Sequence, residues 1–259
     1  MTSTTHPDGP TARSAPPPGP ATPRPRPRRR AAWWLLPMAA VIILVTARAL
    51  SAYVPPDLHT SRVPPRSELH YALLLAHIFT ATVAVLTGIA QFWPWLRRHH
   101  PAVHRRIGRT YFFAGVFPSA VIGIPVALLA PTGLSNELAL LVLDILWIIT
   151  ALAGYRTACR RRYADHRTWM IRNFALTLVA ITSRLLQPAI EYLTAAQLPD
   201  PVSYAGNQLT ASHDIASATA WLGLVLNLIA AEYLIQRRGK RATRQPAARQ
   251  RGAQRPAAS

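Results

Sequence analysis

Six apolar segments, each about as long as a membrane-spanning helix, dominate this chain of 259 residues. The segments cover residues 33–53, 71–93, 111–130, 136–158, 170–193 and 215–236. A helix needs about 20 apolar residues to cross the hydrocarbon core of a bilayer. In lipid, only helices and closed barrels satisfy every backbone polar group internally. The sequence therefore predicts an all-α, polytopic bundle of six transmembrane helices.

The composition excludes several classes of protein. Half of the residues are hydrophobic and 15% are charged, well below the roughly 25% of a soluble domain. A soluble single-domain enzyme and a fully disordered chain are both excluded. The one cysteine, Cys159, rules out an intramolecular disulfide framework. The sequence has no nucleophile elbow, phosphate-binding loop or zinc-protease motif, so it leaves open whether the chain is an enzyme.

Both ends of the chain are basic and contain few large apolar side chains. Residues 1–30 carry six Arg and one Asp, and residues 237–259 carry eight Lys or Arg and no acid. This composition predicts disordered tails around a domain of residues 31–236. Such tails bind nucleic acid or anionic lipid. Beside membrane helices we favour lipid head groups, at about 1 kcal/mol per basic residue, and expect no specific nucleic acid.

The basic residues also predict the orientation of the bundle. The two tails and the loops after the second and fourth apolar segments carry 25 of the 29 Lys and Arg, when Arg156 and Arg172 at the borders of the latter loop are included. By the positive-inside rule, both termini are expected in the cytoplasm. The first apolar segment ends in Ala47-Arg48-Ala49 and could instead be a cleaved signal peptide, which would leave five helices in the same orientation. Its length favours a retained helix.

Polar side chains recur inside the apolar segments, where they are costly and often functional. Their helical spacing predicts a polar face on the second, fourth, fifth and sixth helices, and the first and third helices are expected to be peripheral. The predicted intramembrane polar site consists of His77, Gln91, Asp144, Arg184, Gln187 and Asn227. Asp144 and Arg184 lie at similar depth, either as a structural ion pair or as part of a functional site with His77.

Two of the basic loops share a motif. Each places His-Arg just before a new helix, followed by another Arg four or five residues later. A helix N-terminus with His and Arg suits an anion such as a phosphate head group, a carboxylate or a haem propionate. Ordinary positive-inside basicity is the alternative. The predicted anion or head-group site consists of His104, Arg105, Arg109, His166, Arg167 and Arg172.

Three functions remain open. The first is a haem-binding or quinone-linked redox protein with haem b held between histidines of two helices. Its outer ligands would be His70 or His77 with His213, and its inner ligands His104 and His166. The second is a transporter of protons or a small polar solute along the intramembrane polar site. The third is a non-catalytic, lipid-binding scaffold that uses its basic surface. The oligomeric state is not determined.

The segment from about residue 70 to 235 resembles a family of bacterial membrane proteins, domain of unknown function 2306. The resemblance is carried by His77, the stretches Gly88–Phe92, His104–Arg109 and His166–Arg172, and by Tyr111, Trp147, Arg184, Trp221, Asn227 and Glu232. It implies a multi-pass protein of the bacterial plasma (inner) membrane. The family itself is uncharacterised, so the resemblance implies no activity.

Overall fold

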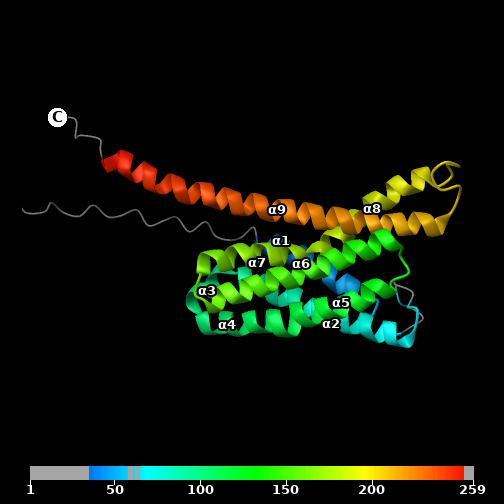
Figure 1. The fold of residues 1–259 in the computed structure, drawn as a ribbon, viewed down its shortest axis with the longest axis horizontal. Coiled ribbons are helices and arrows are strands. Elements are labelled where there is room, and N and C mark those ends of the chain that lie inside the picture. Colours follow the sequence, from blue (N-terminus) through cyan, green and yellow to red (C-terminus); the bar gives the residue numbers. More distant parts are fainter. Residues whose placement is uncertain (1–34, 58–60, 62–64, 254–259) are drawn as a thin grey trace, which may run out of the picture. The chain divides into compact units, whose positions relative to one another are not determined.

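The computed structural model describes residues 35–57, 61 and 65–253, and all regular structure in this part of the chain is helical (Figure 1). The elements are α1 (Leu35–Leu50), α2 (Glu68–Phe92), α3 (Pro94–His99), α4 (Pro101–Thr110), the π-helix η1 (Tyr111–Val116), α5 (Phe117–Leu129), α6 (Leu134–Cys159), α7 (Tyr163–Thr177), α8 (Val179–Gln197) and α9 (Gln208–Ala253). The expected N-terminal disordered tail, residues 1–30, lies outside the described residues.

Four helices in the described part of the chain are long and apolar enough to cross a membrane. They are residues 68–92, 101–129, 134–159 and 208–239. The other two apolar segments form different structures. The first becomes α1, which has 16 residues, and the fifth is divided into α7 and α8 at Leu178. The described part of the chain is therefore all-helical, with four helices of membrane-spanning length.

A side chain from α9 bridges the break between α7 and α8. Asn227 Nδ2 donates to the carbonyl oxygen of Ala175 at 3.0 Å, before the break. Its Oδ1 accepts from the Thr182 hydroxyl at 2.9 Å, after the break. A neighbouring helix commonly supplies such bonds where a membrane helix is interrupted. Asn227 thus joins the two halves of the fifth segment.

The third apolar segment lies in the core, so the expectation that it is peripheral is wrong. Tyr111, Val116 and Ala120 have no exposed surface, and they pack with residues of α2, α6, α7, α8 and α9. The segment has few polar residues, and it packs through apolar and small side chains instead. Helix α1 packs on the outside of the bundle, against α2 and α8.

A buried hydrogen-bond network links η1, α6 and α7. The Tyr111 hydroxyl donates to Asn173 Oδ1 at 2.6 Å. Asn173 Nδ2 donates to the Trp147 carbonyl at 2.9 Å and to the Thr150 hydroxyl at 2.8 Å. Trp147 Nε1 donates to the Thr177 hydroxyl at 3.0 Å. Because polar groups in an apolar interior are costly when unpaired, this network fixes how the three helices are rotated against each other.

Small residues let the helices approach closely, as is common between membrane helices. A Cβ atom added to Gly115 of η1 would lie 2.8 Å from Ala84 Cα of α2, and one on Gly223 of α9 would lie 2.7 Å from Ser183 Oγ of α8. Gly115 and Ala84 therefore set the contact between α2 and η1.

Helix α9 extends well beyond its apolar part, to Ala253. Residues 237–253 are therefore helical where their composition predicted disorder. Arg, Ala, Gln and Lys have high helix propensity, and the preceding apolar helix removes the cost of nucleating a new one.

The contact at Gly115 predicts a large effect of one added methyl group. We expect Gly115→Ala to lower stability by about 1–3 kcal/mol, because the backbones of α2 and η1 must separate. The measurement is thermal unfolding of the protein in detergent. Gly239→Ala is the matched control, since an added Cβ there meets nothing within 4 Å, and it should leave stability unchanged or slightly raised. Equal effects of the two variants would contradict the assigned contact.

Candidate functional site

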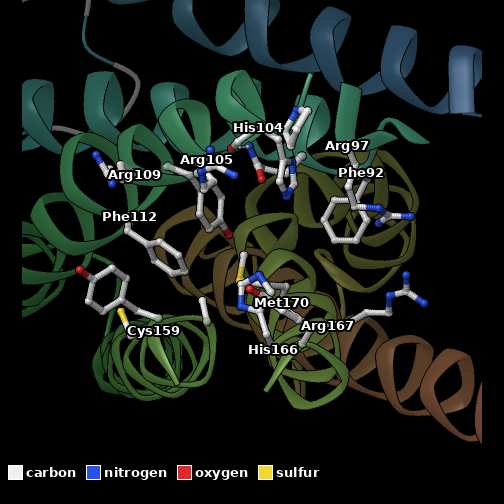
Figure 2. A pocket seen from close by; sticks show the side chains of 17 residues that line it. Phe92, Arg97, His104, Arg105, Arg109, Phe112, Cys159, His166, Arg167 and Met170 are labelled. Atoms are coloured by element: carbon white, nitrogen blue, oxygen red, sulfur yellow. Dashed lines mark hydrogen bonds between the residues drawn. The ribbon is translucent and has the colours of Figure 1, made fainter. Parts of the chain in front are cut away.

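A cavity of about 590 Å³ lies among the end of α2, α3, α4, η1, the end of α6 and the start of α7 (Figure 2). We call it the His/Arg cavity. Its lining residues are Gln91, Phe92, Arg97, Pro101, His104, Arg105, Gly108, Arg109, Tyr111, Phe112, Tyr155, Ala158, Cys159, Tyr163, His166, Arg167 and Met170. Segments far apart in the sequence thus meet at one end of the bundle.

The charges around the His/Arg cavity are all of one sign. Among its described lining residues there are four arginines and no carboxylate. The two ion pairs of the described chain, Arg162–Asp165 and Arg172–Glu232, do not use lining residues. Burial lowers the pKa of the Arg97 guanidinium below its usual value, and the positive charges of Arg167, Arg98 and Arg238 lower it further. Such a concentration of positive charge favours a bound anion.

Two histidines project into the His/Arg cavity from opposite sides, His104 from α4 and His166 from α7 (Figure 2). His166 Nδ1 lies 2.8 Å from the carbonyl oxygen of Gly154. Since a carbonyl only accepts, Nδ1 donates this hydrogen bond, and in the neutral imidazole the lone pair then lies on Nε2. The backbone of His104 is fixed by Gln91, whose Nε2 donates to the His104 carbonyl at 3.0 Å.

One wall of the cavity is aromatic. The rings of Phe112 and Tyr155 meet edge to face with centroids 5.7 Å apart, and Phe92 packs on Phe174 at 4.7 Å. Tyr111 belongs both to this wall and to the buried hydrogen-bond network. The His/Arg cavity therefore offers an apolar surface on one side and cationic groups on the other.

The π-helix η1 places the aromatic residues of this wall. It ends two residues before Pro118, which has no N–H and so cannot bond the carbonyl one turn earlier. A π-helical turn is a common response to such an interruption and is frequent at functional sites. Within it, Tyr111 and Phe112 are both buried.

The structure brings together five of the six residues predicted as an anion site. His104, Arg105, Arg109, His166 and Arg167 all line the His/Arg cavity. The sixth, Arg172, lies elsewhere. Its guanidinium bonds Glu232 of α9 at 2.9 Å and lies 5.2 Å from the ring centroid of Trp169. Arg172 therefore ties α7 to α9.

The residues predicted as one intramembrane polar site are found in different places. Gln91 lines the His/Arg cavity. His77 Nδ1 donates to the Ser119 carbonyl at 3.0 Å. Gln187 is exposed and bonds Glu191 at 2.7 Å, and Asn227 bridges the break at Leu178.

Asp144 and Arg184 form no ion pair with each other among the described residues. The Asp144 carboxyl is 5% exposed and packs against Gly123 of α5. The Arg184 guanidinium donates to the Ala180 carbonyl of its own helix at 2.9 Å. Asp144 and Arg184 therefore face different neighbours.

The outer histidines do not form a matched pair of haem ligands. The fully buried His70 uses Nδ1 to accept from the Arg66 N–H at 3.1 Å. His213 packs beside Gly133 in the loop between α5 and α6. Within the described chain, no group of three His, Cys, Asp or Glu side chains could hold a metal ion. These positions therefore give the outer haem site no geometric support.

Arg97 and the aromatic wall are not among the residues that the sequence predicts as a site. In the sequence Arg97 is one of several loop charges, and Phe92, Phe112 and Tyr155 have the pattern of ordinary apolar or interfacial residues. One signal in the sequence was proximity. Three of these four residues lie within a few positions of a His-Arg motif, or of the end of the helix that precedes the motif. Their shared contact with one space depends on how α2, η1 and α6 pack.

Comparison with known proteins gives one match. The family model described as predicted membrane protein, domain of unknown function 2306, matches residues 74–235. This range includes every residue that lines the His/Arg cavity. No curated protein and no solved structure matches the chain.

The double role of Tyr111 leads to a prediction. Tyr111→Phe should destabilise the protein by about 1–3 kcal/mol, because Asn173 Oδ1 loses its donor in a buried site. Tyr155→Phe, on the same cavity wall but outside the buried network, should have a smaller effect. Thermal unfolding in detergent of both variants and the parent tests this. A Tyr111→Phe protein as stable as the parent would show that the network does not fix the helices.

Proposed function

We propose a function for a chain that belongs to the domain of unknown function 2306 family of membrane proteins: it binds an anionic amphiphile in the His/Arg cavity. One observation carries the proposal. Four arginines and two histidines surround a space that has an aromatic wall and, among the described lining residues, no carboxylate. A positive charge excess without internal partners is expected to attract an anion from outside.

The chemistry of the lining indicates the class of ligand. Guanidinium groups bind phosphate and carboxylate through paired, charge-assisted hydrogen bonds. The aromatic wall of Phe92, Phe112 and Tyr155 suits an apolar body. A volume of about 590 Å³ lies in the usual range for small-molecule sites. We infer a ligand with a phosphate or carboxylate group on an apolar body, which lipid head groups and other membrane-borne anions share.

The proposal includes a topology. We infer six spans, with α1 as the first and α7 with α8 as the fifth, and both termini in the cytoplasm of a bacterial plasma membrane. The positive-inside distribution of Lys and Arg supports this orientation. The bonds of Asn227 across the break support treating α7 and α8 as one span. The His/Arg cavity then faces the cytoplasm, and the basic tails lie near anionic head groups.

A transporter is less well supported than a binding protein. A transport route needs polar groups that follow one another through the bundle. His77 Nδ1 bonds the Ser119 carbonyl, Asp144 packs against Gly123, and Arg184 bonds the Ala180 carbonyl, so each of the three side chains contacts a different residue.

The ligand proposal predicts a specific loss of binding in Arg105→Ala. A charge-assisted hydrogen bond contributes about 1.5–3 kcal/mol, so affinity for an anionic lipid should fall about tenfold or more. The measurement is titration of the detergent-purified full chain with short-chain phosphatidylglycerol. Arg106→Ala is the matched control, because Arg106 is exposed on the same helix and does not line the cavity. Equal losses in both variants would contradict a localised site, and so would parent binding of zwitterionic phosphatidylcholine at equal strength.

The topology predicts how cysteines react with an impermeant thiol reagent. The exposed Cys159 lies at the end of α6, so it should be protected in intact cells and labelled after permeabilisation. Ser203→Cys in a Cys159→Ser background should be labelled in intact cells. Ser203 lies in the loop between α8 and α9, at the end of the bundle opposite to Cys159. The reverse pattern would contradict the orientation.

A further inference from the structure

Anion binding explains the arginines of the His/Arg cavity but leaves its two histidines without a role. His104 and His166 come from different helices, α4 and α7, and from different parts of the sequence. Both project into the same space (Figure 2). A site for a phosphate alone would not need two imidazoles on opposite sides.

His166 is oriented as a metal ligand would be. Its Nδ1–H donates to the Gly154 carbonyl at 2.8 Å, so in the neutral imidazole the lone pair lies on Nε2. Histidines that bind metals almost always donate the other ring N–H to a carbonyl or carboxylate, because this fixes the ring and raises its basicity. Gly154 also allows α6 and α7 to approach, since a Cβ there would lie 3.1 Å from Met170 Sδ.

His104 supplies a second imidazole that the protein itself does not use. Its buried Nδ1 has no hydrogen-bond partner among the described residues. The bond from Gln91 to its carbonyl positions the backbone and leaves the ring available. Because Nδ1 has almost no accessible surface, an occupant of the cavity would meet Nε2 of this ring.

Two opposed histidines, an aromatic wall and a set of arginines match one amphiphile closely. Haem b is a flat apolar macrocycle with two carboxylates on one edge, and helical bundles hold it between histidines of two helices. The macrocycle supplies four of the iron's ligands. Two protein nitrogens complete the coordination, so the group of three ligands that a bare ion needs is not required.

We propose that the ligand of the His/Arg cavity is haem b, with His104 and His166 as axial ligands and with Arg97, Arg105, Arg109 and Arg167 as partners for the propionates. This inference rests on the proposed function, because it names the anionic amphiphile of the same site. It assigns the haem to the inner pair of histidines and away from His70, His77 and His213. Bound haem would supply one-electron transfer, while the chain holds the iron and neutralises the carboxylates.

The test is the visible spectrum of the full chain, expressed with ample haem supply and purified in detergent, before and after reduction with dithionite. The parent should show a Soret band, sharp reduced bands and about one haem per chain. His104→Ala and His166→Ala should each lower the haem content about tenfold or more. His99→Ala is the matched control, because His99 lies on α3 outside the cavity and bonds the Trp95 carbonyl. It should keep the parent spectrum.

Folding is checked separately from ligation. His166→Ala also loses the bond to Gly154, so size-exclusion elution and circular dichroism must match the parent. His166→Met keeps a possible iron ligand of another type. It should retain haem with an altered spectrum, because the axial ligand sets the electronic properties of the iron. An unaltered spectrum in this variant would overturn His166 as a ligand.

The result also separates this inference from the proposed function. A parent protein that stays colourless and takes up no added hemin, but binds phosphatidylglycerol in an Arg105-dependent way, would overturn the haem assignment and leave the anion site intact. Haem that persists in both His104→Ala and His166→Ala would overturn it as well. A parent that binds neither hemin nor anionic lipid would overturn both proposals.

Discussion

The hydrogen bonds between Tyr111, Asn173, Trp147 and Thr177 are the interaction on which the rest of the structure depends. All four side chains are buried where apolar residues surround them. Leaving a buried polar group unpaired costs more folding free energy than one hydrogen bond contributes. The elements η1, α6 and α7 are therefore each fixed in one rotation about their own axes relative to the others. Apolar packing alone would tolerate several rotations, because it is not directional.

The rotation of these helices determines which of their side chains face the His/Arg cavity. With Tyr111 fixed in the network, the next residues of η1 turn Phe112 toward Tyr155, and α7 directs His166 toward His104. Gly154 and Gly115 allow the backbones to approach closely enough for these contacts. The arginines are then gathered at the end of the bundle, where they remain close to water. An apolar bundle thus ends in a cavity lined by four arginines.

The two His-Arg motifs could be recognised in the sequence, because in each of them His and several Arg lie within a few residues of one another, just before an apolar segment. His104, Arg105, Arg109, His166 and Arg167 could therefore be predicted as a group. The intramembrane polar residues could not be grouped in this way. Helical spacing predicts the face and the approximate depth of a side chain, but it does not predict its neighbours, since Asp144 packs against Gly123 and Arg184 bonds its own helix. Arg172 shows a second limit, because its partner Glu232 lies on a helix distant in sequence.

The sequence by itself determined that the chain is helical and suited to a membrane, and that its basic residues gather in particular loops. These properties follow from local composition and from the length of apolar segments, which need no knowledge of neighbours. Only the tertiary structure decided that the third segment lies in the core, that the fifth is broken at Leu178 and bridged by Asn227, and that two distant histidines share one cavity. Those features depend on which helices are adjacent and how each is rotated, and close packing of small residues and buried hydrogen bonds sets both.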